Sequence, residues 1–498
     1  MPESQKRFYI TTTLPYVNAE PHVGFAAEII RADIIARWRR LNGDQVFFNT
    51  GTDEHGAKIH QKARSMSLEP QAYVDGIYGK FVDLLAAVGA PLDMADEGFK
   101  RNFIRTTDPH HVMAAQEFWK TVDKNGYIYK KDYSIKYCIG CELEKTESEL
   151  VNGRCPLHPL QELEIIHEEN YFFRFSSFKE KLLALYAAAP GFVVPNARFN
   201  EIKAFIERGP EDFSISRLAS KMPWGIPVPN DPEQVMYVWF DALVDYISAI
   251  GWPDRLDGFQ AWWVETGGVV QYCGKDNLRQ QAAMWQAMLM AAGLPPSKAI
   301  VVDGFITGDG GVKMSKSLGN TIDPFDIVKT YGTDALRYYA ARELSPFEDS
   351  PFTVERFKEA YNASLANGIG NLTSRILKLT STYGISSALR DKESIYSDET
   401  ARAYAESMAA YDIRSACEHV WARISAMDGE IQAAQPFKLL KSEAASDIER
   451  GKAVLAKLYA ELWVVAVLLE PIMPHTAEAI QSLVKSNSMP EAPLFMRI

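Results

Sequence analysis

The sequence predicts an α/β protein with a doubly wound parallel sheet, followed by an all-helical C-terminal region. Residues 7–13 (RFYITTT) form a β-branched and aromatic run that is typical of a buried strand. A loop with two prolines follows, and from His22 apolar residues recur at helical spacing. Residues 46–56 (VFFNTGTDEHG) give a second buried strand and a polar loop. Strand, helix and strand at the start of the chain indicate a parallel sheet with crossover helices.

The length of the chain allows several domains, and its composition limits the cellular compartment and the kinds of partner that we expect. The chain has 498 residues, 47% of them hydrophobic, and no apolar run approaches ~18 residues free of charge, so we expect no membrane span. The start, MPESQKRFYI, lacks the apolar core of a signal peptide. Five cysteines, an odd number, favour a reducing compartment, the cytoplasm. The net charge of −11 disfavours nonspecific nucleic-acid binding but leaves room for a basic face on one domain.

Polar residues with binding chemistry follow the first two predicted strands. A helix that begins at His22-x-Gly24 places backbone N–H groups and an imidazole where a polyphosphate could bind, and Gly24 leaves room for a nucleotide. Asp53, Glu54 and His55 follow the second strand, at the end where open α/β sheets bind ligands. The alternatives are an ordinary turn with a chance histidine, and a cap for the next helix.

A zinc knuckle is predicted where the alternation of strands and helices stops. Cys138-x-x-Cys141 and Cys155-x-x-His158 are two ligand pairs at the same spacing, a pattern typical of zinc sites. The Asn152–Gly153 turn suits the tight loop that presents the second pair. The alternative is unpaired core thiols beside an incidental histidine. Structural zinc supports many activities, so this site says little about function.

Two further strand–helix units follow the knuckle. In VMYVWFDALVDYIS, a strand and then a helix, Trp239, Ala242 and Tyr246 share one helix face. Simple core packing is the alternative for these side chains. In VVQYCGKDNLRQQ, Asp276 follows the strand, where it either caps the next helix or binds a ribose hydroxyl.

The stretch AIVVDGFITGDGGVKMSKSLGN predicts a strand and then a mobile basic loop. Gly308, Gly310 and Gly311 allow the loop to move. The two lysines and two serines of KMSKS, residues 313–317, suit closure over phosphates and neutralisation of charge that develops there. A solvated basic turn is the alternative. From about residue 355 long helical periods dominate, which predicts a bundle of four or five helices.

These motifs, in this order, resemble the methionyl-tRNA synthetase family, a branch of the class I aminoacyl-tRNA synthetases. TLPYVNAEPHVG, GTDEHG, MYVWFDA, GKD, KMSKS and PIMPH are all similar to family stretches, and the resemblance covers nearly the whole chain. It implies a Rossmann-like catalytic domain in two halves (1–118 and 231–354), a connective insertion with the zinc knuckle (119–230), and a helical anticodon-binding domain (355–498).

The activity implied by the resemblance is ATP-dependent charging of tRNA(Met) with L-methionine, through a methionyl-adenylate. The implied cofactors are structural Zn²⁺ and the Mg²⁺ that accompanies ATP. The chain ends at APLFMRI, where longer family members continue into a tRNA-binding dimerisation module, so we expect a monomer.

The resemblance also assigns roles to individual residues. Catalysis is assigned to His22, Gly24, Lys313 and Lys316, and ATP binding to these four with Glu28, Asp276 and Ser315. Methionine binding is assigned to Leu14, Tyr16, Asp53, Trp239, Ala242, Leu243, Tyr246 and Gln281. The zinc ligands are Cys138, Cys141, Cys155 and His158, and the anticodon readers are Asn371, Arg375 and Phe437.

The chain departs from the family pattern at several positions. Phe25 replaces the second histidine of the first motif, which removes a donor to the triphosphate. Asn277, Gln280 and Gln281 follow GKD where the family has Ile and then Phe-His, so Gln281 stands where a histidine normally lines the methionine pocket. Phe437 replaces a tryptophan, and stacking on a base survives because any aromatic ring offers a π-face.

Two alternatives of different classes remain open on the sequence. The first is another class I synthetase. The isoleucyl, valyl and leucyl enzymes carry a large editing insertion for which this length leaves no room, and in the cysteinyl enzyme zinc reads the substrate thiol. The second is a noncatalytic tRNA-binding relative, which the departures at Phe25 and Gln281 keep open.

Overall fold

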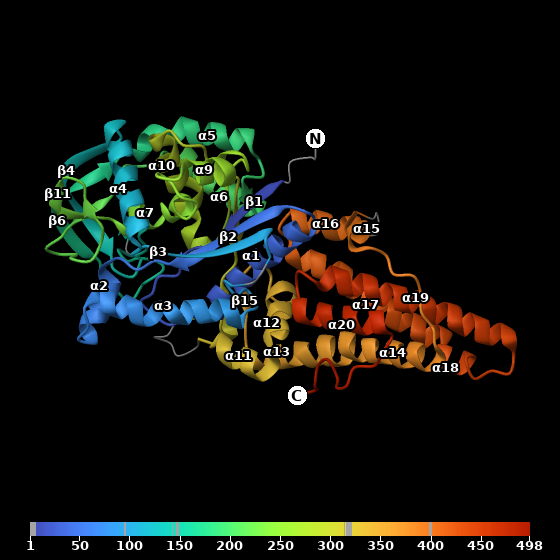
Figure 1. Cartoon of the computed structure of the whole chain (residues 1–498). Coiled ribbons are helices and arrows are strands. Elements are labelled where there is room, and N and C mark those ends of the chain that lie inside the picture. The colour runs from blue at the N-terminus through green and yellow to red at the C-terminus, as the bar shows by residue number, and fades with distance from the viewer. Residues whose placement is uncertain are drawn as a thin grey trace.

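A computed structural model of the chain describes residues 6–93, 96–141, 143–145, 149–312, 314, 321–397 and 401–498, without the side chains of 133–135, 143, 144 and 166–168. An α/β part with a central sheet lies at one end of the molecule, and a long helical bundle extends from it (Figure 1). Within the described residues no helix is both long and apolar enough to cross a membrane.

The central sheet has six strands, and every neighbouring pair is parallel. The predicted doubly wound sheet is therefore confirmed. Its strands, in spatial order, are β3 (Phe99–Arg105), β2 (Gln45–Thr52), β1 (Arg7–Thr11), β12 (Val270–Gly274), β13 (Ala299–Asp303) and β7 (Val193–Val194). The chain runs outward from β1 to β2 and β3, and later from β12 to β13 on the other side. The carboxyl ends of β1 and β12 thus form the switch point where such sheets bind ligands.

Alternation along β1 and β2 divides the core between the two faces of the sheet. Phe8 and Ile10 point into a core that continues through α1 (Val23–Leu41) into the bundle. Tyr9 and Phe47 face the opposite core, where their rings meet edge to face at 5.3 Å. The sheet is buried on both faces, as a parallel sheet requires.

Helices and small sheets complete the α/β part. Its helices are α1, α2 (Ala57–Ser65), α3 (Pro70–Ala87), α4 (Pro109–Lys124), η2 (Phe175–Phe178), α5 (Lys179–Ala188), α6 (Asn196–Glu207), α7 (Val238–Ala242), α8 (Asp245–Ser248), α9 (Leu256–Phe259), η3 (Gln260–Val264), η4 (Lys275–Asn277), η5 (Gln280–Met284), α10 (Trp285–Ala292) and η6 (Asp309–Gly311). One antiparallel sheet contains β5 (Leu143–Lys145), β4 (Ile128–Cys138), β6 (Glu164–Phe173) and β8 (Phe213–Ser214). A second contains β10 (Pro227–Val228), β11 (Asp231–Met236) and β9 (Ser216–Leu218), and β14 (Ile306–Thr307) pairs with β15 (Ser350–Pro351).

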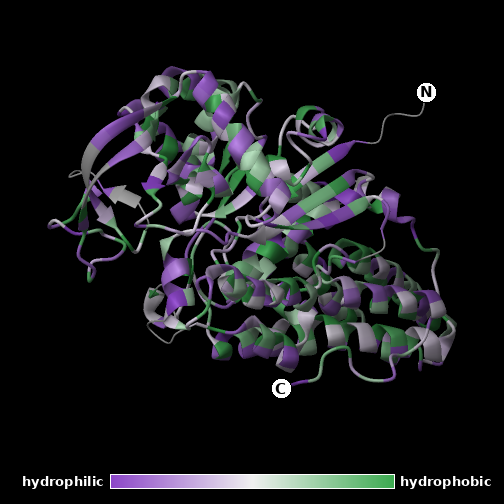
Figure 2. Ribbon diagram, turned by 60° about the vertical axis from the view of Figure 1, so that its left-hand side comes forward, coloured by the Kyte–Doolittle hydropathy of each residue, from purple (hydrophilic) through white to green (hydrophobic). Residues whose placement is uncertain are grey.

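The C-terminal region is helical, as the sequence predicts. Its elements are α11 (Pro324–Tyr331), α12 (Thr333–Tyr338), η8 (Tyr339–Glu343), α13 (Val354–Ala360), η9 (Tyr361–Gly370), α14 (Asn371–Tyr383), α15 (Lys392–Ser397), α16 (Arg402–Ala409), α17 (Ile413–Ala434), α18 (Pro436–Leu439), α19 (Ala445–Leu469) and α20 (Pro474–Ser486). Helix α19 packs against α14, α17, α18 and α20, and it is buried on all sides over residues 462–469, so it is the central helix. The outer helices carry polar residues beside apolar ones (Figure 2).

A buried ion network joins the bundle to the α/β part. The guanidinium of Arg337 lies 2.8 Å from Asp33 of α1 and donates hydrogen bonds of 2.8 Å to the carbonyls of Pro471 and Ile472. Burial disfavours the Asp33 charge, yet Arg37, Arg101 and Arg337 together hold its pKa far below the usual value. The PIMPH stretch therefore takes part in the contact between the two parts of the molecule.

Candidate active site

The first site element is the start of α1. His22 is the N-cap, and its Nδ1 accepts a 3.0 Å hydrogen bond from the Gly24 N–H. A Cβ at position 24 would lie 2.6 Å from His22 Cε1, so glycine is needed for the imidazole to lie against the helix. Phe25 stacks on His22 with ring centroids 4.4 Å apart. The residue that departs from the family pattern thus supports the histidine that remains.

The loop after β1 is tied to both α1 and β12 by Thr13. Its N–H donates to Glu28 Oε1 at 2.7 Å, and its hydroxyl donates to the Tyr272 carbonyl at 3.2 Å. Burial, together with the nearby Asp303 and Asp276, raises the pKa of Glu28 well above the usual value. This shift disfavours a negative charge at Glu28, beside the start of α1.

A buried ion pair lies behind this edge of the sheet, and the sequence analysis missed it. Asp303, the last residue of β13, is 3.2 Å from Arg31 of α1, and both side chains are buried. Burial raises the pKa of Asp303 to about 6, against the opposing effect of Arg31. The available signal was an arginine between the apolar pairs Ile29–Ile30 and Ile34–Ile35 of α1.

The loops after β1 and β2 run side by side. Asp53 donates its N–H to the Pro15 carbonyl at 2.9 Å and accepts from the Val17 N–H at 3.1 Å, which pairs Tyr16 with Asp53. Gly56 has a φ of 116°, and a Cβ there would collide with the Tyr16 hydroxyl. Helix α2 has Gly56 as its N-cap and no side-chain cap, so the alternative that Asp53, Glu54 and His55 cap this helix is wrong.

Glu54 and His55 hold the surrounding elements together. Glu54 is fully buried and binds Arg105 of β3 through two hydrogen bonds of 2.8 and 2.9 Å. His55 Nδ1 and His111 Nε2 lie 2.7 and 2.8 Å from the two oxygens of Asp241, which joins the β2 loop and α4 to α7. Burial opposes ionisation of Asp241, but the two histidines hold its pKa below the usual value. The sequence analysis did not find this network, because its members are remote in sequence.

The segment after β11 differs from the sequence prediction. The sequence predicts a strand over VMYVWF, but β11 ends at Met236 and α7 begins at Val238, so Phe240 lies in the helix and Tyr237 is its N-cap. The expected single helix is also two short ones, α7 and α8, separated by a turn at Leu243 and Val244. Helical hydrogen bonding through this turn continues only in part, since Val244 and Ile247 bond three residues back.

Tyr246 and Gln281 meet in the core beside β12. Gln281 Nε2 donates a 2.6 Å hydrogen bond to the Tyr246 hydroxyl, and both side chains are buried. Ala242 and Leu243 are buried in the same region, Leu14 is buried in the β1 loop, and Trp239 is half-buried. The structure therefore pairs Tyr16 with Asp53 and Tyr246 with Gln281, each near the carboxyl edge of the sheet.

The basic loop is described only at its flanks, and Lys313, Ser315 and Lys316 lie outside the described residues. Met314 is buried in the core shared by the sheet and the bundle. On the other flank, the Ile322 carbonyl accepts a 3.2 Å hydrogen bond from the N–H of Val23, the first residue of α1. The chain thus leaves the basic loop beside the helix start that carries His22.

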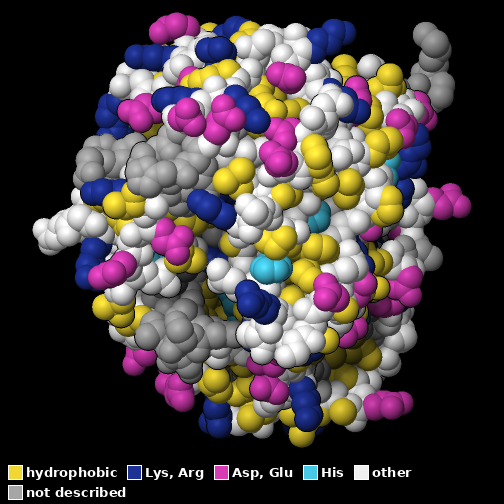
Figure 3. Space-filling view, turned by 90° about the vertical axis from the view of Figure 1, so that its left-hand side faces the viewer, with side chains coloured by type: hydrophobic (Ala, Val, Ile, Leu, Met, Phe, Trp, Pro, Cys, Tyr) yellow, Lys and Arg dark blue, Asp and Glu magenta, His cyan; other side chains and the backbone are white. Residues whose placement is uncertain are grey.

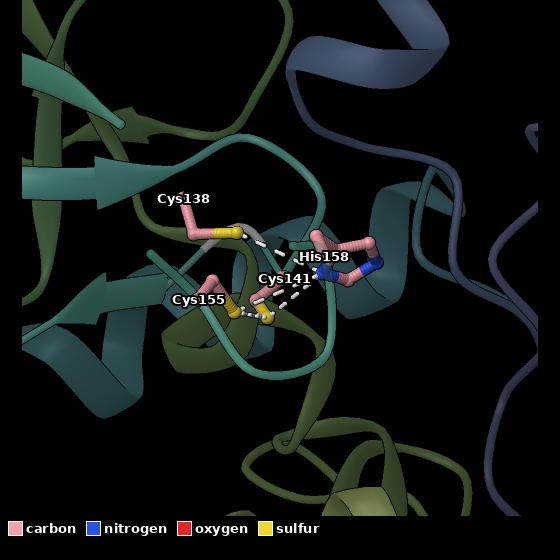
Figure 4. Close-up of side chains that lie close together, drawn as sticks. All are labelled: Cys138, Cys141, Cys155 and His158. Carbon is pink, nitrogen blue, oxygen red and sulfur yellow. Dashed lines mark hydrogen bonds between the residues drawn. The ribbon is translucent and has the colours of Figure 1, made fainter. Parts of the chain in front are cut away.

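The two predicted metal-ligand pairs converge in one cluster. Ligand atoms of Cys138, Cys141, Cys155 and His158 all lie within 4.8 Å of one another (Figure 4). His158 Nδ1 is 3.3 Å from Cys141 Sγ and 3.7 Å from Cys138 Sγ, close to the roughly 3.5 Å between ligand atoms of tetrahedral zinc. A Cβ at Gly140 would collide with the His158 ring, so glycine permits this approach. The donor set and spacing fit zinc.

The cluster is joined to the active-site edge. Lys58 of α2 donates a 2.7 Å hydrogen bond to the Gly140 carbonyl, between the first two cysteines. Arg279, just after GKD, forms a 2.5 Å ion pair with Glu149. The metal-binding loop is thereby connected to the segments after both β2 and β12.

The proposed anticodon residues lie in the bundle. Asn371 and Arg375 occupy the first two turns of α14, and Arg375 forms an ion pair with Asp428 of α17. Phe437 of α18 is 41% exposed, so its ring is not buried in the helical core. An exposed aromatic side chain at this position is available to a partner.

Charges are mixed on the molecular face that carries the metal-binding sheet. Lysine and arginine side chains alternate there with aspartate and glutamate, and neither sign forms a continuous patch (Figure 3).

Comparison with known proteins gives one consistent result. A family model described as tRNA synthetases class I (M) matches residues 8–163 and 149–377. Methionine–tRNA ligase of Thermosynechococcus vestitus is 40% identical over 95% of this chain and 89% of its own length. The chloroplastic/mitochondrial methionine–tRNA ligase of Arabidopsis thaliana is 39% identical over 95% of this chain and 77% of its own length.

Solved structures agree with the sequence relatives. Mycobacterium tuberculosis methionyl-tRNA synthetase in complex with methionyl-adenylate matches with a TM-score of 0.86 and 34% identity, over 96% of this chain and 94% of that one. The apo form of the same enzyme matches with a TM-score of 0.79 and 30% identity, over 100% and 99% of the two chains. The chain belongs to the class I tRNA synthetases and, within them, to the methionyl-tRNA synthetase family.

Proposed function

We propose that this chain forms methionyl-adenylate at the carboxyl edge of its parallel sheet and then transfers the methionyl group to tRNA(Met). The observation that carries the proposal is the convergence on one edge of the His22 helix start, the Tyr16–Asp53 pair and the Tyr246–Gln281 pair. A polyphosphate site and an amino-acid site side by side are what adenylate formation needs.

In the first step, a carboxylate oxygen of methionine attacks the α-phosphorus of ATP, and the bond to pyrophosphate breaks. The protein contributes orientation and charge neutralisation rather than covalent chemistry. His22 binds phosphate at the positive end of the α1 dipole, while Lys313, Ser315 and Lys316 close over it. Asp276 binds the adenosine end, and Mg²⁺ bound with ATP supplies further neutralisation of phosphate charge. Burial raises the pKa of Glu28 well above its usual value, which disfavours a negative charge at Glu28 beside the triphosphate.

The amino acid lies between the β1 and β2 loops and the α7–α8 segment. The Asp53 carboxylate binds the substrate ammonium group. The side chain of methionine lies among Leu14, Tyr16, Trp239, Ala242, Leu243 and Tyr246. This surrounding suits a flexible thioether, because sulfur packs favourably against aromatic edges.

The cluster of Cys138, Cys141, Cys155 and His158 is proposed to hold one structural Zn²⁺. Three thiolates and one imidazole form a closed tetrahedral set with no position for substrate, which supports a structural role. Cys138, Cys141, Cys155 and His158 would hold the zinc, and its binding would order the loop whose Gly140 carbonyl accepts from Lys58 of α2.

The helical region after residue 355 is proposed to bind the anticodon, with the catalytic domain in two halves, 1–118 and 231–354, around the connective insertion 119–230. Phe437 stacks on an anticodon base, while Asn371 and Arg375 contact base edges. None of the five cysteines, all of which lie in the described residues, forms a disulfide, which supports a cytoplasmic setting. The chain is proposed to be a monomer, and a sedimentation mass near twice 55.9 kDa would contradict this.

ATP–pyrophosphate exchange with a panel of amino acids tests the proposed activation step. Purified protein is assayed with methionine, isoleucine, valine, leucine and cysteine in turn. We expect methionine to give the highest kcat/KM by about a hundredfold or more, since shape and polarity differences each contribute ~1–3 kcal/mol. Exchange with another amino acid of the panel would indicate a different class I specificity, and none with any would indicate a noncatalytic relative.

A further inference from the structure

Four polar side chains form a buried relay behind Tyr246, between β12, η5, α10 and the loop before β13. Gln271, Gln281 and Gln286 are 0% exposed and Ser297 is 4% exposed. Buried amides are costly unless they are hydrogen-bonded, and these are linked to one another in a single chain of contacts. The sequence gives one signal of this relay, because Gln271 interrupts an otherwise apolar strand.

The direction of the relay is fixed at one end by backbone groups. The Ser297 N–H donates to Gln286 Oε1 at 3.0 Å, and a backbone N–H can only donate. The Gln286 Nε2 donates to the Gln281 carbonyl at 2.8 Å, and a carbonyl can only accept. The amide of Gln286 therefore has one possible orientation, and its Nε2 also donates to the Ser297 hydroxyl at 3.1 Å.

The orientation of Gln286 determines which group donates and which accepts in each of the following hydrogen bonds. The Ser297 hydroxyl accepts from Gln286 and donates its own hydrogen to Gln271 Oε1. The reverse orientation of the Gln271 amide would leave this buried hydrogen without an acceptor among the described residues, which is costly. The Gln271 Nε2 then donates to Gln281 Oε1 at 2.6 Å, and the Gln281 Nε2 donates to the Tyr246 hydroxyl at 2.6 Å. The Tyr246 oxygen ends the relay as an acceptor, so its hydrogen must point elsewhere.

Among the described residues, no acceptor lies within hydrogen-bond distance of the Tyr246 hydroxyl hydrogen. We propose that Gln271, Ser297 and Gln286 are positioning residues that hold Tyr246 as an obligate hydrogen-bond donor to the side chain of the bound amino acid. This inference rests on the proposed methionine site. For methionine the acceptor is the thioether sulfur, a weak acceptor that a hydrocarbon side chain of the same length lacks.

Gln281 makes this arrangement specific to the chain. A histidine at position 281, as in the family pattern, passes a hydrogen bond in either direction by exchanging tautomers. A glutamine amide cannot reverse the direction in this way when its oxygen and its nitrogen are both hydrogen-bonded. The substitution at 281 therefore accompanies a relay whose direction is set by Gln286 and Ser297, two residues that contact no substrate.

The test compares methionine with norleucine, in which a methylene replaces the sulfur. The quantity is the ratio of kcat/KM for the two amino acids in ATP–pyrophosphate exchange, which does not depend on the fraction of active protein. Ser297→Ala removes the link between Gln286 and Gln271, and Gln271→Met removes the donor to Gln281. In both variants the Gln281 amide is free to rotate and to accept from Tyr246. We expect the ratio to fall about two- to tenfold, the range for one neutral hydrogen bond.

Ser248→Ala is the matched control. Ser248 is a buried serine on the same helix as Tyr246, but its hydroxyl contacts His111 rather than the relay, so the ratio should not change. Tyr246→Phe removes the donor itself and should lower the ratio at least as much as Ser297→Ala.

The outcomes separate two kinds of failure. If Tyr246→Phe lowers the ratio while Ser297→Ala and Gln271→Met leave it unchanged, the relay does not direct Tyr246 and the inference is overturned. If Tyr246→Phe also leaves the ratio unchanged, Tyr246 does not contact the sulfur and the proposed methionine site fails with it. An equal fall in the Ser248→Ala control would show a general effect of buried hydroxyl loss and would overturn the inference as well.

Discussion

At the scale of single residues, the departures from the family pattern are compensated by contacts nearby. Phe25 stacks on His22, and Gln281 takes part in an extended relay instead of acting alone. Such compensation follows from close packing, because a changed side chain is tolerated only when its neighbours occupy the space and satisfy the polar groups. The importance of His22 and Gly24 is then open to direct test.

Gly24→Ala should lower exchange activity. The added Cβ would lie 2.6 Å from His22 Cε1, so the ring must leave its position as N-cap. We expect kcat for methionine-dependent exchange to fall about tenfold or more, since loss of one preorganised donor costs up to ~10²–10³. Gly76→Ala on α3, where the new Cβ meets nothing within 4 Å, is the control. Unchanged kcat in Gly24→Ala would show that this imidazole position is not needed.

Asp245→Asn should stabilise the protein at neutral pH. Asp245 is fully buried, its carboxylate oxygens have no hydrogen-bond partner among the described residues, and burial raises its pKa well above the usual value, with Asp241 adding to the effect. The folded state keeps a proton that the unfolded state releases above pH ~4, so stability falls as pH rises from there. Asparagine does not titrate in this range, so the variant does not lose stability through this group as the pH rises.

Urea unfolding of both proteins from pH 5 to pH 8 measures the effect. The wild type should lose up to ~1.4 kcal/mol per pH unit through this group, and Asp245→Asn should show a flatter profile and a higher midpoint at pH 8. A variant less stable than the wild type at pH 8 would mean that the carboxyl is stabilised by contacts not identified here.

At the scale of elements, the metal-binding loop is the most local and therefore the most predictable part. Its four ligands lie within about twenty residues, and spacing alone brings them together. The basic loop is less predictable from local sequence, because its position depends on the contacts of its flanks. One flank is hydrogen-bonded to Val23, which is far away in the sequence.

Cys155→Ala should release the metal and destabilise the loop. Purified wild type should contain one zinc per chain, and the variant should contain little, because zinc binding contributes directly to folding. Zinc content by atomic absorption and the midpoint of thermal unfolding are the measurements. Cys417→Ala, a buried thiol in the bundle outside the cluster, should keep its zinc. Zinc retained at one equivalent in Cys155→Ala would contradict the ligand assignment.

Lys316→Ala should affect the reaction far more than substrate binding. A lysine that meets charge mainly in the transition state contributes to kcat, so a loss of ~10²–10³ in exchange is expected with little change in methionine affinity. Lys329→Ala, an exposed lysine on α11 after the loop, serves as the control. Similar exchange rates in the two variants would rule out a phosphate clamp at Lys316.

At the scale of the whole molecule, local sequence patterns predicted the architecture but not the contacts that join its parts. Strand alternation, helical period and ligand spacing are properties of short segments, so the parallel sheet, the cysteine cluster and the bundle could be expected. The Asp33–Arg337 contact and the relay from Gln286 to Tyr246 join remote segments, and periodicity carries no information on such pairs. The pairing of β7 with β13 in the main sheet also joins segments that are remote in sequence.

The central claim is that one chain activates methionine in its α/β part and recognises tRNA through its bundle. The most direct measurement is charging of tRNA(Met) with methionine beside ATP–pyrophosphate exchange, in the same preparations of wild type, Phe437→Ala and Phe437→Trp. Stacking is worth ~1–3 kcal/mol per base, so Phe437→Ala should raise the KM for tRNA roughly tenfold and leave exchange nearly intact. Phe437→Trp should keep both activities, because it keeps the ring. Exchange without charging in the wild type, or equal loss of both activities in Phe437→Ala, would contradict the account.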